Sequence, residues 1–226
     1  MDHLVLAAVV EELSRFLLDR VIEDVVQLES CRFLVRFSRP PFPRVHIAIH
    51  PRLSTIHLAR GMKTPAVPTE LAVELTRELA GRAVLSVIKP RAERPARFEL
   101  TGGRALIVEL MGKASNILLL GAGGEILRFA RKHHGEFRQP VVGEPYTPPP
   151  PSSRWVVNDL ESLTRPRFEA IVHAAGDDLS VRLVESIPGL SVPLAREIAF
   201  RVRAGADPWP GLEELLARSS SAGPRS

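Results

Sequence analysis

Two short apolar runs, residues 105–110 and 117–120, are separated by a polar break that contains Gly112. Runs of about four to eight residues that are rich in Ile, Leu and Val and bounded by turn residues are typical of buried β-strands. Glycine adopts backbone angles that a Cβ atom disfavours, so Gly112 suits a tight connection. The sequence therefore predicts two neighbouring buried strands. A plain β-hairpin with a solvated turn is the simplest interpretation, but polar turn residues can also meet a partner. The polar side chains in this turn are those of Lys113, Ser115 and Asn116.

The composition allows one large domain or two smaller ones, because the chain has 226 residues and 45% of them are hydrophobic. Its one cysteine, Cys31, has no partner for an internal disulfide and cannot build a zinc site by itself. We expect no cofactor, and a reducing, cytoplasmic setting.

Neither an export signal nor contact with a membrane is expected. The first residues form an acidic, amphipathic pattern rather than a basic segment followed by an apolar block. No apolar run approaches the roughly 18 residues that a membrane span needs. The net charge is +4 and the pI about 9.8, with arginine as the main basic residue. Arginine suits bidentate contacts with phosphate, although arginine richness also arises from the nucleotide composition of a genome.

Hydrophobic periodicity predicts two helices that each precede a set of strands. Apolar residues at three- and four-residue spacing over residues 4–18 predict an amphipathic helix with Asp2 as its N-cap. A second helix is predicted between Thr69, as N-cap, and Gly81, as C-terminal stop. The predicted strands lie at residues 21–28, 31–37, 44–49, 54–59, 83–88, 97–100, 104–110, 117–120 and 125–129. The pattern predicts an α+β fold in which residues 1–145 form a two-layer β-sandwich with helices.

Three histidines lie in or beside these strands: His46, His50 and His57. No cysteine or carboxylate accompanies them at a spacing typical of a metal site, and outward-facing histidines are common on strands. We therefore expect no bound metal.

Five prolines between residues 145 and 151 make that segment stiff and extended. We predict a linker at residues 146–158, a separate all-α domain at residues 159–217, and a disordered tail at residues 218–226. The helices predicted for this domain lie at residues 164–175, 179–187, 192–204 and 211–217.

The break between two of these helices resembles a helix-hairpin-helix turn and consists of Pro188, Gly189, Leu190 and Ser191. In such a turn, backbone N–H groups and the partial positive charge at the start of the second helix can hold a phosphate, independently of base sequence. Arg196 follows a little over one helical turn later. An ordinary helix connection that contains a glycine is the alternative interpretation.

A basic run precedes the proline segment and consists of Arg128, Arg131, Lys132, His133, His134 and Arg138. Such a run is most often a solvated loop, but it can also contact a nucleic-acid backbone with an affinity that falls as salt rises. The sequence contains no Gly-rich phosphate loop, no evident nucleophile with a base and no acidic metal cluster. We therefore predict no enzymatic activity.

Residues 109–119 resemble the signature ELMG-x-x-SN-I of NFACT amino-terminal domains. Three further segments agree with that family in the same order. They are residues 1–2 ahead of an amphipathic helix, His50-Pro51 followed by residues 56–58, and residues 143–149. The resemblance extends over roughly residues 1–205.

The resemblance implies tRNA binding during the rescue of stalled large ribosomal subunits. NFACT domains carry an Asp-Arg pair that engages tRNA, and Glu93-Arg94 stands at the corresponding place. A carboxylate can accept a hydrogen bond from a base amino group, and an arginine can donate to a base or a phosphate. The signature turn also departs from the family, with Lys113-Ala114 where Arg-His is usual.

NFACT domains resemble formamidopyrimidine-DNA glycosylase, in which a β-sandwich precedes a helix-hairpin-helix domain. Those enzymes use an amino-terminal proline nucleophile and often a four-cysteine zinc finger. This chain begins Met1-Asp2-His3 and has one cysteine, so glycosylase activity is not expected.

Family members continue into a coiled coil and a further domain, and no heptad run is found up to Ser226. We therefore expect a fragment, a split gene product with a separate partner chain, or a short homologue. Two alternative functions stay open: a DNA-binding protein or degenerate glycosylase, and a surface protein that binds fibronectin.

Overall fold

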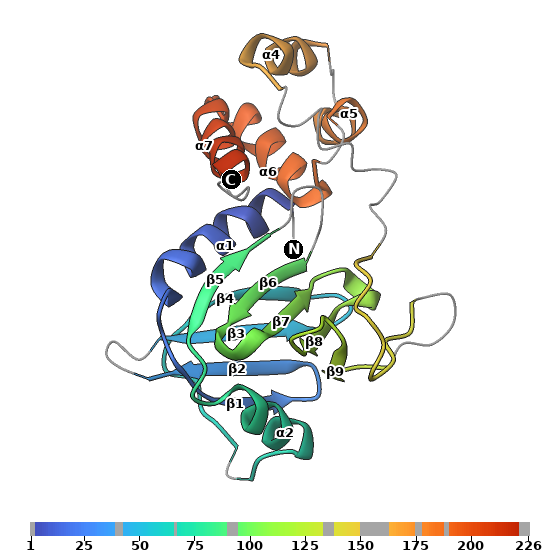
Figure 1. The fold of residues 1–226 in the computed structure, drawn as a ribbon. Helices are drawn as coiled ribbons and strands as arrows, with labels where there is room; N and C mark the ends of the chain where they lie inside the picture. The colour runs from blue at the N-terminus through green and yellow to red at the C-terminus, as the bar shows by residue number, and fades with distance from the viewer. Residues whose placement is uncertain are drawn as a thin grey trace.

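The fold is described by a computed structural model over residues 3–38, 43–65, 67–89, 95–132, 138–149, 163–174, 178–187 and 190–221 (Figure 1). It combines two antiparallel sheets with helices, which confirms the α+β class. The four-stranded sheet has its strands in chain order: β1 (Ile22–Glu29), β2 (Arg32–Phe37), β3 (Arg44–Ile49) and β4 (Ser54–Ala59). The five-stranded sheet also has its strands in chain order: β5 (Val84–Ile88), β6 (Pro95–Leu100), β7 (Arg104–Glu109), β8 (Asn116–Leu120) and β9 (Ile126–Phe129).

The hairpin predicted from the two apolar runs is formed by β7 and β8. Its strands are paired from Ala105 with Leu120 to Glu109 with Asn116. One face of the hairpin joins the core between the sheets, and the other face packs near Tyr146 in a second, smaller cluster. This burial on both faces explains why the two runs are continuously apolar instead of alternating.

The main hydrophobic core lies between the two sheets. Phe33 and Ile47 enter it from the first sheet, and Val108 and Leu119 enter it from the second, all with almost no exposed surface. Burying one such side chain stabilises a fold by roughly 1.5–3 kcal/mol relative to leaving it exposed. The helix α1 (His3–Leu17) adds its apolar face to this core and packs against β4 and β5, one edge strand from each sheet.

The helix α2 (Glu70–Leu79) begins and ends as the sequence predicts. The Thr69 hydroxyl accepts a hydrogen bond from the Ala72 N–H at 3.3 Å, and Gly81 has a φ of +79° just after the helix. This helix packs against β1. Ion pairs between Glu74 and Arg128, and between Glu78 and Arg104, tie it to the five-stranded sheet.

The carboxyl-terminal part of the chain is helical. Its helices are α4 (Arg165–His173), α5 (Leu179–Ser186), α6 (Val192–Arg203) and α7 (Trp209–Ser221). They surround a core of their own, in which the Phe168 and Trp209 rings lie 5.6 Å apart and Leu183 is fully buried. α7 packs against α1, so the helical part rests on the first helix of the chain (Figure 1).

The structure describes the chain at two of the predicted domain boundaries, near residues 218 and 146. α7 continues to Ser221, so the first residues of the tail predicted to be disordered from residue 218 are helical. No Gly or Pro interrupts residues 212–222, which explains why the helix does not stop earlier. At the other boundary, Pro145 forms a bridge with Glu125, and the Tyr146 N–H donates to the Gly124 carbonyl at 2.9 Å. The chain is thus still attached to the sheet where the linker was predicted to begin. Residues 150–162 lie outside the described residues, so the division into domains stays a prediction.

Among the described helices, none combines the length and the apolar character that crossing a bilayer requires.

Candidate nucleic-acid interface

Three connecting segments meet at one end of the two sheets. Residues 110–115 link β7 to β8, and residues 130–132 leave β9 at the same end, because β8 and β9 are antiparallel neighbours. The third segment, residues 50–53, links β3 to β4 in the other sheet. We call residues 50–53, 110–115 and 130–132 the junction segments.

The Asn116 side chain holds two junction segments together. Its Oδ1 atom accepts hydrogen bonds from the N–H groups of Ile117 and Arg131, each at 2.9 Å. Its Nδ2 atom donates to the Arg131 carbonyl, also at 2.9 Å. A side-chain amide thus pairs with the backbone of residue 131 as a neighbouring strand would, which fixes where the chain goes after β9.

The Arg131 side chain connects these two segments to the third. Its Nη1 atom donates to the carbonyl oxygens of Ile49, at 3.0 Å, and Ser115, at 3.3 Å. Gly112, with a φ of +61°, lies against the same segment, since a Cβ atom on it would be 3.4 Å from the Pro51 carbonyl. The glycine noted in the sequence therefore suits this turn through its left-handed backbone angle, and it lies in contact with the third segment.

The exposed charges on the junction segments are all positive. Arg52, Lys113 and Lys132 are each exposed, and each comes from a different segment. None of the residues in these segments is Asp or Glu. Arg52 was not among the residues predicted from sequence, because it is an isolated arginine in a short connection and its position beside the other two segments depends on strand pairing and on the contact of Arg131 with Ile49. The Arg52 N–H donates to the His50 ring at 3.2 Å, which orders the connection.

Two of the predicted binding residues have buried side chains. Ser115 is 0% exposed and Asn116 is 1% exposed. The Ser115 hydroxyl accepts a hydrogen bond from the Met111 N–H at 2.8 Å, and Asn116 is engaged as described above. Neither side chain lies where a nucleic acid reaches it in this structure, and both shape the turn that presents Lys113.

The basic run predicted from sequence is divided by the fold. Arg128 forms an ion pair with Glu74 on α2, and Arg131 is directed at backbone carbonyls. Arg138 forms an ion pair with Glu109 and a hydrogen bond with the Thr147 carbonyl. Of the described members of the run, Lys132 is the one with an exposed side chain.

Glu109 is a buried carboxylate that holds the segment after the basic run. Besides the ion pair with Arg138, its Oε1 atom accepts a hydrogen bond from the Tyr146 hydroxyl at 2.9 Å. The Arg138 guanidinium also lies 5.1 Å from the centre of the Tyr146 ring. Burial raises the pKa of Glu109, and the charge of Arg138 with the two hydrogen bonds partly opposes this rise.

Glu93 and Arg94 lie outside the described residues. The strand that follows them begins at Pro95, which pairs with Glu109 at the end of β7. Pro95, the first described residue after the pair, therefore lies at the same end of the sheet as the junction segments.

Pro188 and Gly189 of the predicted helix-hairpin-helix turn also lie outside the described residues. The residues that follow them have internal roles. Leu190 is 5% exposed and its N–H donates to the Ile187 carbonyl, and the Ser191 hydroxyl caps α6 by accepting from the Leu194 N–H at 3.3 Å. Arg196 is exposed on α6.

Histidines face each other on β3 and β4. His46 pairs with His57 in the sheet register, and their ring centres are 4.9 Å apart. Burial, and secondarily the neighbouring His57 and Arg32, lowers the pKa of His46 to about 4. The described residues contain no group of three His, Cys, Asp or Glu side chains that could hold a metal ion.

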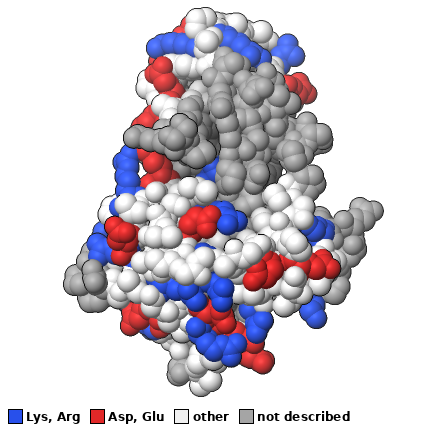
Figure 2. Space-filling model, viewed as in Figure 1, with Lys and Arg blue, Asp and Glu red and all other residues white. Residues whose placement is uncertain are grey.

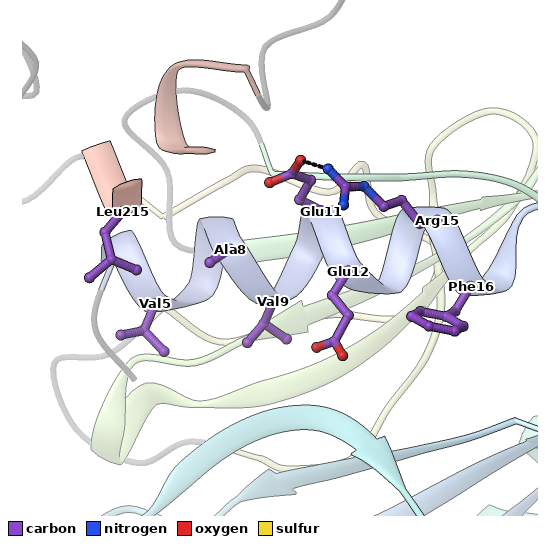
Figure 3. A pocket seen from close by; sticks show the side chains of 8 residues that line it. All are labelled: Val5, Ala8, Val9, Glu11, Glu12, Arg15, Phe16 and Leu215. Atoms are coloured by element: carbon purple, nitrogen blue, oxygen red, sulfur yellow. Dashed lines mark hydrogen bonds and ion pairs between the residues drawn. The ribbon is translucent and has the colours of Figure 1, made fainter. Parts of the chain in front are cut away.

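The surface carries mixed charges on one face and an apolar groove along α1. In Figure 2, the Lys and Arg of the described residues are interspersed with Asp and Glu, so these residues form no broad field of one sign on the face drawn there. A groove of about 470 Å³ runs along α1, lined by apolar side chains that include Val9 and Phe16, with Leu215 of α7 at one end (Figure 3). Its charged residues are Glu12 and the ion pair between Glu11 and Arg15.

The sequence matches the family described as NFACT N-terminal and middle domains over residues 2–217. The chain therefore belongs to this family, as its sequence signature predicts. No curated protein sequence matches it.

Several solved structures share its fold. The N-terminal domain of the fibronectin-binding protein PavA from Streptococcus pneumoniae has a TM-score of 0.70 and 22% identity, over 90% of this chain and 80% of that one. The N-terminal part of the fibronectin/fibrinogen-binding protein from Streptococcus suis has a TM-score of 0.70 and 18% identity, over 96% and 84%. The fibrinogen-binding protein from Staphylococcus aureus has a TM-score of 0.68 and 20% identity, over 97% and 81%.

Proposed function

We propose that this chain is a non-catalytic RNA-binding module that engages tRNA during the rescue of stalled large ribosomal subunits in the cytoplasm. Membership of the NFACT family supports this proposal, because the resemblance that identified the family implies this role.

The observation that carries the proposal is the sign of the exposed charge at the junction segments. Arg52, Lys113 and Lys132 are exposed there, and no acidic residue occurs in the same segments. Phosphate groups are the ligands that such a group of cations attracts, and much of the affinity for a nucleic acid comes from these contacts. Pro95, the first described residue after Glu93 and Arg94, lies at the same end of the sheet.

Glu93 and Arg94 are proposed to add recognition to this electrostatic attraction. An arginine fork that meets a base edge discriminates by about 1–3 kcal/mol. Arg94→Ala should therefore weaken binding and reduce the difference between tRNA species, whereas Arg91→Ala, the matched change in the same connection, should leave that difference intact. If the two variants and the unmodified protein all show the same preference among tRNA species, a recognition role for Arg94 is contradicted.

The finer fold assignment is also a proposal. A β-sandwich followed by α4–α7 agrees with the layout expected of a glycosylase-like domain and a helix-hairpin-helix domain. For the helix-hairpin-helix part, Leu190 and Leu194 already donate their N–H groups internally and Pro193 has none. A phosphate at this turn would thus depend mainly on other amides and on Arg196.

The test is direct comparison of ligands. Fluorescence anisotropy with labelled tRNA, plain DNA duplex and duplex containing an abasic site should give the highest affinity for tRNA, with an affinity that falls steeply as salt rises. Preference for the abasic duplex would favour the DNA-binding or degenerate glycosylase alternative. Absence of measurable tRNA binding at low salt would refute the proposal.

Fibronectin binding is the second candidate, because two of the structurally similar proteins are described as fibronectin-binding. Binding of the protein to immobilised fibronectin, measured in the same buffer, distinguishes this candidate from tRNA binding. Saturable binding to fibronectin together with no binding to tRNA would replace the first proposal with this one.

A further inference from the structure

We propose that Arg52, Lys113 and Lys132 act as one surface for the RNA sugar-phosphate backbone, and that Arg131 is the positioning residue that assembles this surface. We call these three residues the junction surface. The inference rests on the proposed RNA-binding function, and it assigns that function to a place on the molecule that the linear sequence does not reveal.

The first step is proximity. The three cations come from the β3–β4 connection, the β7–β8 connection and the segment after β9, which are far apart in sequence. A single guanidinium nitrogen of Arg131 donates to the carbonyl oxygens of Ile49, three residues before Arg52, and of Ser115, two residues after Lys113. Since Lys132 is the next residue after Arg131, all three cations are attached within a few residues of one shared hydrogen-bonded group.

The second step is rigidity. The carbonyl oxygens that Arg131 contacts are main-chain atoms, so the contacts fix the paths of the segments and not merely their side chains. Asn116 holds the backbone of Arg131 through two hydrogen bonds of 2.9 Å. The close approach of Gly112 to the Pro51 carbonyl brings the first two segments into contact as well. A cationic surface held in this way loses little conformational freedom at its backbone when it binds.

The third step is chemistry. The junction segments contribute only cations. The Glu109 carboxylate at the end of β7 is buried and paired with Arg138, and the Glu29 carboxylate in the neighbouring β1–β2 turn is paired with Arg32. Phosphates spaced along a nucleic-acid strand match several cations on separate segments, and such contacts position a strand without reading its bases. Exposed Leu53, 74% accessible beside Arg52, adds an apolar surface that a sugar or base can cover.

The experiment compares two triple variants of equal charge change. The junction variant carries Arg52→Ala, Lys113→Ala and Lys132→Ala. The control variant carries Arg60→Ala, Lys63→Ala and Arg77→Ala, three exposed cations that lie after β4 and on α2. Affinity for labelled tRNA is measured over a salt series, with far-UV circular dichroism to verify that each variant is folded.

The junction variant should bind tRNA more weakly, and the slope of log affinity against log salt should become shallower by about two units, since each lost phosphate contact reduces it by roughly 0.7–0.9. The control variant should keep the slope of the unmodified protein to within about half a unit, by the same relation. Equal losses in both variants would show a diffuse charge effect and overturn the inference, and so would an unchanged slope in the junction variant.

The positioning role of Arg131 needs a readout other than stability. Arg131→Lys keeps the charge but loses the planar fork of donors. In the unmodified background it should weaken tRNA binding about fivefold or more, within the coupling range seen for residues that act together. In the junction variant the same change should have no further effect. Equal effects in the two backgrounds would mean that Arg131 acts independently, which would refute its positioning role.

The outcomes separate the two proposals. If the unmodified protein does not bind tRNA, the proposed function fails and this inference fails with it. If it binds tRNA but the two triple variants behave alike, the function stands and the assignment to the junction surface is wrong. Displacement of tRNA by polyglutamate at equal charge concentration would also overturn the inference, because it would indicate a surface for acidic proteins.

Discussion

Asn116 offers a sharp test of how the candidate interface is held together. The side chain is 1% exposed and makes three hydrogen bonds of 2.9 Å, two with the backbone of Arg131 and one with the Ile117 N–H. Asn116→Ala removes all three. Each contributes about 1 kcal/mol net to stability, so the free energy of unfolding should fall by about 3 kcal/mol. For a protein of this size that corresponds to a melting temperature lower by about 6–12 °C.

The assay is urea unfolding followed by far-UV circular dichroism, which reports on strands and helices together, whereas Trp209 fluorescence would report on the helical core around α7. Lys113→Ala is the matched control, since Lys113 is exposed in the same connection. It should change the stability by less than about 0.5 kcal/mol. A loss below about 1 kcal/mol for Asn116→Ala would refute the argument, because it would mean that water replaces these bonds at little cost.

Four further predictions follow from the fold. The raised pKa of Glu109 means that, as pH rises, the folded state keeps a proton that the unfolded state has already lost. The contribution of this group to the free energy of unfolding is therefore largest below pH 4.5 and falls as pH rises through the folded pKa. Glu109→Gln should remove that dependence from urea unfolding midpoints measured at a series of pH values. The pKa of His46 is lowered from 6.5 to about 4, so the unfolded state gains a proton first and stability should fall between pH 6.5 and 4; if His46→Gln shows the same fall, another group is responsible. Leu183→Ala, at a fully buried site in α5, should cost about 2–5 kcal/mol, whereas Val181→Ala, at a site 48% exposed, should change little when both are measured by urea unfolding. Limited proteolysis should cut near residues 145–154 or in the tail, and resistance throughout both regions would contradict the predicted linker.

The local structure of this protein was largely determined by its sequence. The apolar runs on either side of Gly112 predicted the β7–β8 hairpin, and Thr69 with Gly81 predicted both ends of α2. These features depend on residues close together in the sequence, so a linear pattern is enough to identify them. Examples are the hydrogen bond from the Ala72 N–H to the Thr69 hydroxyl and the left-handed backbone angle of Gly81. The signature around Glu109 also identified the family.

Only the tertiary structure decided which charged residues face solvent at the candidate interface. In the sequence, Arg128, Arg131, Lys132 and Arg138 form one basic run, and nothing in their spacing separates them. In the fold, Arg128 pairs with Glu74 and Arg138 with Glu109, across 54 and 29 residues, while Lys132 is exposed. Arg52 joins Lys132 at the interface through a contact of Arg131 that spans 82 residues. The physical reason is that an ion pair or a hydrogen bond needs two groups within about 3–4 Å, and for groups so far apart in sequence that distance is set by strand order, register and helix packing.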